Sequence, residues 1–319
     1  MRAANNFSEH FTGALRFPCV CSLVEIIRRA QSIPMKVLIT GSGGQLGHHL
    51  QELLKAKRVE YVATDVNELD ITDFGAVNEL IKKYKPSHVI NTAAYNAVDL
   101  CEENVAIAFA INAAGPWNLA LAARENDCVF VHVSSDFVFD GTKKSPYVET
   151  DPPNPQSAYA RSKYAGELLV QNAGGKYFIL RTAWLYGDEG KNFPTAIIER
   201  AHAEEVLSVV EDQVGCPTYA KDLAEAIFAL TQTKAYGLYH GVNKGSASWY
   251  SFARAILKEV ELDATVQTQT AKQYAKGVNR VVAARPAHSE LATDKLQKES
   301  GYTFRPWQEA LHEWAEKKN

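Results

Sequence analysis

The feature that most restricts the fold of this chain is a strand pattern, a glycine-rich turn and an amphipathic helix in direct succession. Val37–Thr40 is a short apolar run, Gly41–Gly47 carries glycines at three-residue spacing, and Leu46–Ala56 has leucines that recur on one helical face. Apolar runs and helical patterns then keep alternating as far as Trp184. Strands that alternate with helices form parallel β-α-β units, so we expect an α/β fold with a doubly wound parallel sheet.

The remaining elements can be placed by range. We expect strands at Val59–Thr64, His88–Asn91, Val129–Ser134 and Tyr177–Arg181, and helices at Phe74–Lys83, Val105–Asn126 and Tyr159–Gln171. The part after Trp184 is less regular, with helices expected near Pro194–Ala203, Asp222–Leu230 and Trp249–Val260 and a short strand near Gly237–His240.

The first 34 residues stand outside this pattern. The chain has two methionines, Met1 and Met35, and Met35 directly precedes the first strand. We interpret residues 1–34 as an extension that is not part of the fold. Charged residues interrupt its amphipathic stretch, which disfavours an export signal. We also expect no membrane partner, because no apolar run approaches the roughly 20 residues that span a bilayer.

Composition limits the other partners of the chain. Lys plus Arg total 34 and Asp plus Glu total 37, and the resulting net charge of −3 gives no electrostatic reason to expect nucleic acid. The five cysteines show neither disulfide nor zinc spacing. This favours reduced thiols and a cytoplasmic location.

The glycine turn predicts where a nucleotide would bind. Gly41, Gly44 and Gly47 follow a strand and open a helix, and small residues in that context let a pyrophosphate approach the positive helix N-terminus. Asp65 ends the second strand about 20 residues further on, where a carboxylate accepts hydrogen bonds from ribose and repels a 2′-phosphate. We therefore expect NADH, with NADPH possible.

Other residues complete the expected cofactor site. Gln45 and Leu46 belong to the turn, and Asp70 and Ile71 either lie beside the adenine or cap the next helix. We predict a dinucleotide-binding Rossmann domain over residues 35–185. Residues 186–319 are then mainly a smaller substrate-binding domain, with some segments that return to the Rossmann sheet.

A tyrosine and a lysine four residues apart, Tyr159 and Lys163, indicate acid–base chemistry. On a helix they lie on one face, where the lysine cation would bring the high pKa of the phenol closer to the range that a proton donor needs. Ser135 and Asp136 follow the fourth strand, at the edge where such sheets bind ligands. The glycine turn, the strand-end serine and the Tyr-Lys pair occur in this order along the chain.

This order resembles the extended short-chain dehydrogenase/reductase superfamily, and further segments resemble one of its families, the dTDP-4-dehydrorhamnose reductases. The segments are Gly44–Gly47, Ser134–Gly141, Tyr159–Glu167, Arg181–Trp184, Asp212–Thr218 and Arg285–Leu291. The resemblance runs from Met35 to about Trp314. Its Asp-Gln-x-Gly-x-Pro-Thr and Arg-Pro-x-x-Ser-x-Leu segments are quite specific to the family.

The resemblance implies reduction of the C4 ketone of dTDP-4-dehydro-L-rhamnose to dTDP-L-rhamnose, a nucleotide-sugar step of cell-surface polysaccharide biosynthesis. It implies that Tyr159 protonates the developing alkoxide, Lys163 holds the nicotinamide ribose and Ser135 hydrogen-bonds the reacting oxygen. Family members often carry Thr at the position of Ser135, and both residues offer a hydroxyl. The resemblance also places Ala93, Ala94 and Tyr95 at the cofactor, and Asp136, Trp184 and Arg285 at the dTDP-sugar.

The residues alone leave alternatives for two of these positions. Trp184 is also explained as a core indole, and Arg285 as a surface ion pair. Some family members are dimers around Mg²⁺ held by carboxylates, one of them just beyond the third glycine. Here His48 and His49 occupy that stretch, so we predict no metal site. We expect a monomer or a homodimer.

Two other functions stay open on the sequence. One is a non-catalytic NAD(P)-binding regulatory subunit that resembles that of methionine adenosyltransferase, and the other is a nucleotide-sugar epimerase. The presence of Ser135, Tyr159 and Lys163 favours catalysis over the first. Gln45 follows Gly44, where epimerases usually place an aromatic residue, and this favours a reductase over the second.

Overall fold

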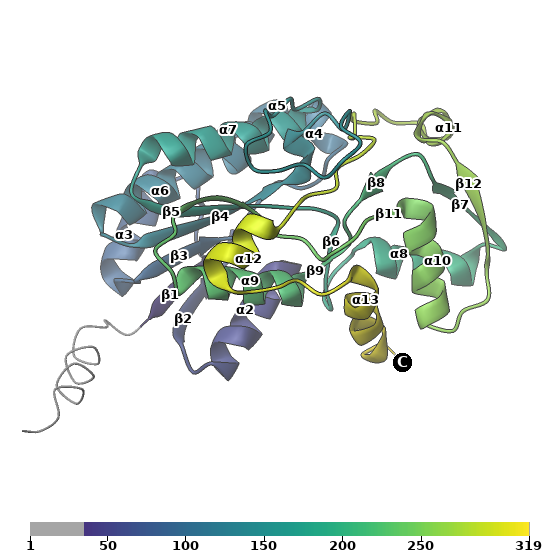
Figure 1. The fold of residues 1–319 in the computed structure, drawn as a ribbon. Helices are drawn as coiled ribbons and strands as arrows, with labels where there is room; N and C mark the ends of the chain where they lie inside the picture. Colours follow the sequence, from purple (N-terminus) through teal and green to yellow (C-terminus); the bar gives the residue numbers. More distant parts are fainter. Residues whose placement is uncertain (1–34, 319) are drawn as a thin grey trace, which may run out of the picture. The chain divides into compact units, whose positions relative to one another are not determined.

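The computed structural model describes residues 35–318, and they belong to one compact unit. The first element is the strand β1 (Lys36–Thr40) and the last is the helix α13 (Trp307–Glu316). Figure 1 shows the described part as a sheet flanked by helices, followed by a group of smaller elements. The predicted extension, residues 1–34, lies outside the described residues.

Six strands form one parallel sheet, in the order β10-β5-β4-β3-β1-β2. Besides β1, they are β2 (Glu60–Thr64), β3 (His88–Asn91), β4 (Val129–Ser135), β5 (Lys176–Thr182) and β10 (Gly237–His240). The order reverses between β1 and β3, which is the point where doubly wound sheets bind their ligands, outside the carboxyl ends of the strands. The predicted fold class is confirmed.

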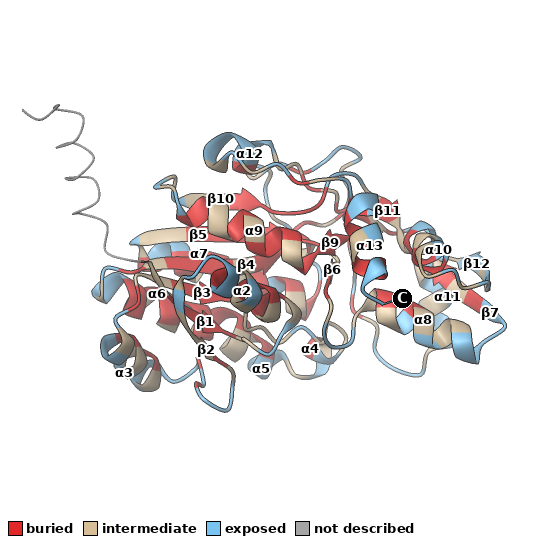
Figure 2. Cartoon of the chain, turned by 90° about the horizontal axis from the view of Figure 1, so that it is seen from below, coloured by how far each residue is buried: buried red, intermediate tan, exposed pale blue. Residues whose placement is uncertain are grey.

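Helices cover both faces of this sheet (Figure 1). One face carries α3 (Phe74–Tyr84), α6 (Gly115–Glu125) and α7 (Ala158–Ala173), and the other carries α2 (Gln45–Ala56), α9 (Ala220–Thr231) and α12 (Asp294–Ser300). Leu38 packs against the helices of the first face, whereas Val37 and Ile39 pack against those of the other face. Figure 2 shows the strands buried between the exposed outer sides of the helices.

The chain after β5 also builds a separate core outside the main sheet. The elements of this region are β6 (Leu185–Tyr186), α8 (Phe193–Ala203), β7 (Val206–Val210), β8 (Val214–Gly215), β9 (Thr218–Tyr219), β11 (Ala247–Ser248), α10 (Trp249–Glu259), β12 (Thr265–Gln269), α11 (Ala271–Gly277) and α13. Tyr186, Phe252 and Trp314 are fully buried in this core. Three elements of the same half, β10, α9 and α12, lie on or in the main sheet. The predicted division at residue 185 stays a prediction.

The helix predicted over Val105–Asn126 is a composite. It consists of α5 (Val105–Phe109), a π-helical turn η1 (Ala110–Ala114) and α6, and the short helix α4 (Leu100–Glu103) precedes it. A π-helical turn inserts one extra residue into an α-helix, and such turns are frequent at functional sites. The turn places the Asn112 side chain where it holds both backbone groups of Tyr95.

The same composite helix corrects one expectation from the sequence. By length and apolar composition, Val105–Glu125 is sufficient to cross a membrane, although we expected no run that approaches this length. Half of its most apolar window is buried, and it packs against α3 and α7. It is therefore explained as a core helix of the α/β fold.

Candidate active site

Three cavities adjoin one another, two of them at the carboxyl edge of the sheet and one among the elements of the second half of the chain. The glycine-turn groove has a volume of about 550 Å³, the central chamber about 440 Å³ and the outer pocket about 480 Å³. The groove and the chamber share the lining residues Gly44, Thr92, Ala94 and Asn96. The chamber and the outer pocket share Phe193, Trp249 and Arg285. A long ligand or two ligands end to end can therefore occupy them together.

The glycine turn fits a pyrophosphate. Gly41 has φ +72°, and a Cβ atom at this residue would lie 2.5 Å from the backbone nitrogen of Ala93. A Cβ atom on Gly47 would lie 2.5 Å from the carbonyl oxygen of Gly41, so the third glycine lets α2 approach the turn. The N-cap of α2 is Gly44, which makes no side-chain cap. The first N–H groups of the helix are therefore left to bind an anion.

Asp65 lies at the mouth of the groove. Its Oδ2 accepts a hydrogen bond from the backbone N–H of Gly43 at 2.8 Å. Asp70 and Ile71 line the same groove, and the Asp70 carboxylate also accepts bonds from the backbone and hydroxyl of Thr72. Among the described residues that line the groove there are two carboxylates and neither a lysine nor an arginine. This charge distribution favours a ribose with a free 2′-hydroxyl over a 2′-phosphate.

The structure separates the predicted cofactor residues into two groups. Gly41, Gly44, Gln45, Leu46, Asp65, Asp70, Ile71, Ala93 and Ala94 line the groove or the chamber. Gly47 and Tyr95 do not line either cavity. The side chain of Tyr95 packs beside Cys101 and Ala158, and its backbone is held by Asn112. Tyr95 therefore helps to fix the loop after β3 without lining a cavity.

The predicted catalytic side chains meet in the central chamber. Tyr159 and Lys163 lie on α7, which begins after the N-cap Ser157, and Ser135 ends β4. The Ser135 hydroxyl lies close enough to the Tyr159 phenol to influence its pKa. Lys163 is almost fully buried and donates to the carbonyl oxygen of Val133 at 2.7 Å. Two separate elements thus present a phenol, a hydroxyl and an amine to one space.

The pKa values of Tyr159 and Lys163 differ from the expectation that the lysine cation lowers the pKa of the phenol. Burial holds the pKa of Tyr159 well above that of a free phenol, and the nearby Ser135 hydroxyl opposes this only in part. Lys163 is not among the groups that lower it. Burial also lowers the pKa of Lys163 to about 8, against the opposing charge of Glu167. Tyr159 is therefore protonated at neutral pH and available as a proton donor.

The carboxyl group of Asp136 lies beside these side chains in the chamber lining. The Ser135 hydroxyl donates to its Oδ1 at 3.0 Å, and the nearby Ser289 hydroxyl helps to lower its pKa. Burial raises the pKa of Asp136 to about 6. Ser289 belongs to the Arg-Pro-x-x-Ser-x-Leu segment, which begins with Arg285 at the chamber, so this segment contacts the site at two points.

The indole of Trp184 packs against Trp249 and lies close to Gly215. Its indole stacks on that of Trp249 at 3.4 Å between ring centroids and 5° between planes. A Cβ atom on Gly215 would lie 2.5 Å from the Trp184 ring, so only glycine leaves room for the indole there. Trp184 also has φ +45°, which is uncommon for a bulky residue and often marks a functional site. Sequence reasoning missed Trp249, because no motif contains it.

A family model described as the RmlD substrate binding domain matches residues 35–319. The chain belongs to this family. Its similarity to solved structures covers nearly the whole matched region. A dTDP-4-dehydrorhamnose reductase from Clostridium acetobutylicum is 44% identical with a TM-score of 0.84, over 88% of this chain and 99% of that one.

Two further members show the range of the family. A dTDP-4-dehydrorhamnose reductase from Bacillus anthracis, solved in complex with NADP, is 37% identical with a TM-score of 0.85, over 89% of this chain and 100% of that one. The spore coat polysaccharide biosynthesis protein SpsK of Bacillus subtilis is 38% identical over 284 residues, 89% of this chain and 98% of SpsK. The resemblance drawn from the sequence motifs is confirmed.

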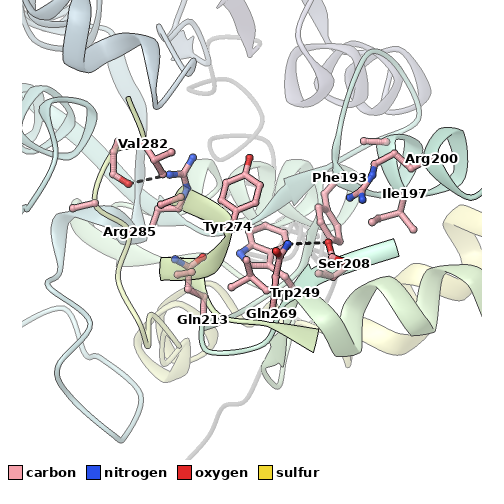
Figure 3. A pocket seen from close by; sticks show the side chains of 17 residues that line it. Phe193, Ile197, Arg200, Ser208, Gln213, Trp249, Gln269, Tyr274, Val282 and Arg285 are labelled. Atoms are coloured by element: carbon pink, nitrogen blue, oxygen red, sulfur yellow. Dashed lines mark hydrogen bonds between the residues drawn. The ribbon is translucent and has the colours of Figure 1, made fainter. Parts of the chain in front are cut away.

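The outer pocket of this RmlD-family chain combines aromatic, amide and cationic groups (Figure 3). Tyr274 and Trp249 lie between Arg285 and Arg200 in the view of Figure 3. Arg200 is engaged by both carboxylate oxygens of Glu204 at 2.9 and 3.0 Å. Arg285 forms an ion pair with Asp99 that is partly shielded, unlike the surface pair we considered, and it also lines the outer pocket and the central chamber.

The stretch where some family members hold Mg²⁺ has a different donor set in this chain. His49 is buried, with Nδ1 3.2 Å from Glu52 and Nε2 3.8 Å from Asp188. Lys317 already pairs with Asp188 at 2.6 Å. Burial lowers the pKa of His49, so the imidazole is largely neutral. Mg²⁺ prefers an octahedral set of oxygen ligands, and this group does not fit that preference.

Proposed function

We propose that the chain reduces the C4 ketone of dTDP-4-dehydro-L-rhamnose to dTDP-L-rhamnose with NADH or NADPH, in the biosynthesis of a cell-surface polysaccharide. The observation that carries this proposal is that Ser135, Tyr159 and Lys163 line one chamber, which adjoins the groove on one side and the outer pocket on the other. Relatives with this name match nearly the full folded region.

The three cavities accommodate the two reactants. The glycine turn and Asp65 would hold the pyrophosphate and adenosine ribose of the dinucleotide. The ketone-bearing sugar would lie in the chamber beside Trp184 and Asp136. Arg285 stands where the chamber meets the outer pocket, so it would meet the diphosphate, and the nucleoside would enter the outer pocket.

The nicotinamide cofactor, when bound, supplies the hydride that converts the ketone to an alcohol. Tyr159 would donate its hydroxyl proton to the developing alkoxide, because its raised pKa keeps that proton in place until charge appears on the sugar oxygen. Ser135 would hydrogen-bond the same oxygen. Lys163 would bind the hydroxyl groups of the nicotinamide ribose through its ammonium N–H groups.

A panel assay tests this proposal. The protein is supplied with NADH or NADPH and with dTDP- and UDP-4-keto-6-deoxy sugars, and cofactor oxidation is followed by absorbance. We expect net oxidation with the dTDP-linked rhamnose precursor and a lower kcat/KM with UDP-linked sugars. A regulatory subunit would oxidise no cofactor with any sugar. An epimerase would return its cofactor after each turnover and show no net oxidation.

The cysteines and the proposed substrate bear on the compartment in which the protein would act. Cys101, Cys128 and Cys216 are free thiols among the described residues, and burial raises the pKa of Cys216 to about 12, so it is not a nucleophile. Reduced thiols and a nucleotide-linked substrate support a cytoplasmic enzyme. We propose that it acts as a monomer or a homodimer, and sedimentation of the purified protein would decide between them.

A further inference from the structure

The carboxylate of Asp99 gathers donors from one segment of the second half of the chain. Asp99 follows Val98, which lines the central chamber, and directly precedes α4. Its Oδ1 accepts from the backbone N–H of Ala283 at 3.1 Å and from Nη2 of Arg285 at 2.8 Å. Nη2 of Arg280 lies 3.4 Å from its Oδ2. Asp99 therefore ties residues 280–285 to the loop after β3.

This contact fixes a wall that two cavities share. Residues 282–285 line the outer pocket, and Arg285 also lines the central chamber. Only 14% of the Asp99 side chain and 23% of the Arg285 side chain are exposed. Ion pairs that are shielded in this way are screened less by solvent and salt than surface pairs.

The guanidinium of Arg285 uses only some of its N–H donors in hydrogen bonds with the rest of the described protein. Nη2 donates to Asp99 and Nη1 donates to the carbonyl oxygen of Ala283 at 2.9 Å. Within residues 35–318 its Nε–H makes no hydrogen bond, and a guanidinium has five N–H donors in all. Two arginines face the single carboxylate of Asp99, so the group as a whole keeps positive charge for an anion.

We propose that Asp99 is a positioning residue that presents Arg285 to the diphosphate of the nucleotide-sugar. The inference rests on the proposed function, because it assumes a diphosphate at the junction of chamber and outer pocket. A long arginine side chain loses rotamer freedom when it binds a ligand, and prior ordering by Asp99 removes part of that cost. Asp99 acts through Arg285 and does not touch the reacting atoms.

The test uses the whole protein and dTDP as the probe, with binding measured by calorimetry. Asp99→Asn keeps an oxygen that can accept from Ala283 but removes the charge that orients Arg285. We expect the Kd for dTDP and the KM for the dTDP-sugar to rise about tenfold, as for a lost charge-assisted hydrogen bond. The kcat should stay within about twofold, because the contact is made equally in ground and transition states. The Kd for NADH should not change.

Two variants separate positioning from general stability. Asp127→Asn removes a solvent-exposed ion pair, with Lys176 at 2.6 Å, at the opposite edge of the sheet and should leave all these values unchanged. Asp99→Glu keeps the charge and should recover part of the dTDP affinity.

A double-mutant cycle then tests whether Asp99 acts through Arg285. Arg285→Lys loses the planar fork, so adding Asp99→Asn to it should cost little more. Equal or tighter dTDP binding by Asp99→Asn, or fully additive effects of the two substitutions, would overturn the inference. A wild-type protein that does not bind dTDP would instead contradict the proposed function, and with it this inference.

Discussion

Tyr159 is the residue on which the proposed chemistry depends most. Tyr159→Phe keeps the ring and its edge contact with Phe137 but removes the hydroxyl. General acid catalysis contributes about 10²–10⁴-fold, so we expect kcat to fall within that range. The Kd for NADH should change little, whereas Lys163→Ala should weaken NADH binding as well as turnover. Rapid-mixing turnover and fluorescence titration of both variants measure this division, and near wild-type turnover by Tyr159→Phe would exclude Tyr159 as the proton donor.

The lowered pKa of Lys163 predicts a pH dependence of cofactor binding. Below a pH of about 8 the side chain is an ammonium that can donate to ribose hydroxyls, and above it the charge is progressively lost. We expect the Kd for NADH to increase as the pH rises through about 8, measured by fluorescence titration. Lys163→Ala should show a flat profile over the same interval, and a wild-type profile equally flat would refute this role.

Asp65 should decide between the two nicotinamide cofactors. Its carboxylate lies in a groove whose described lining contains neither lysine nor arginine, and we expect NADH to have the higher kcat/KM. Asp65→Ala should narrow the gap between NADH and NADPH. Asp65→Asn is the matched variant, because it keeps an acceptor for the N–H of Gly43 and removes only the charge. The prediction is wrong if the wild type prefers NADPH or if both variants keep the original ratio.

Among the elements, β8 and the start of α10 together hold Trp184. Gly215→Ala would place a Cβ atom within 2.5 Å of the indole, so Trp184 must shift from its stack on Trp249. Overpacking costs about 1–3 kcal/mol, and we expect a lower Tm together with a higher KM for the dTDP-sugar. Gly277→Ala is the control, because no atom lies within 4 Å of its Cβ position. A rise in KM with Gly277→Ala, or unchanged values with Gly215→Ala, would count against this account.

The sequence predicts some elements well for a physical reason. β1 and β4 are buried on both faces, so they appear as continuous apolar runs between turns. Two-residue strands such as β6 and β8 are too short to show an alternating apolar pattern. The helix α13 was not predicted, although its buried face includes Trp307 and Trp314. The π turn in the composite helix was also missed, because its extra residue hardly alters the apolar pattern.

In the molecule as a whole, the site depends on contacts between distant segments. Ser135 could be predicted because the carboxyl ends of parallel strands share one edge, and Lys163 because its four-residue spacing from Tyr159 places both on one helical face. The stack of Trp184 on Trp249 and the pairing of Asp99 with Arg285 could not, because each joins residues that no local pattern connects. Motifs therefore located the candidate catalytic residues, whereas the contacts that form the cavity walls required the structure.

Residues 1–34 provide a prediction about the full chain. The family match begins at Met35, directly before β1. We expect a protein that starts at Met35 to fold and to turn over like the full-length protein, with the same Tm and kcat/KM. A sharp loss of Tm or activity on truncation would show that the extension is part of the enzyme.

The most direct measurement follows the hydride itself. The protein is given dTDP-4-dehydro-L-rhamnose and NADH that carries deuterium in its transferable position, and the sugar product is analysed by NMR. The account predicts dTDP-L-rhamnose with deuterium at C4, formed rapidly by the wild type and about 10²–10⁴-fold more slowly by Tyr159→Phe. Unlabelled sugar, or label at another carbon, would contradict reduction of the C4 ketone by this chain.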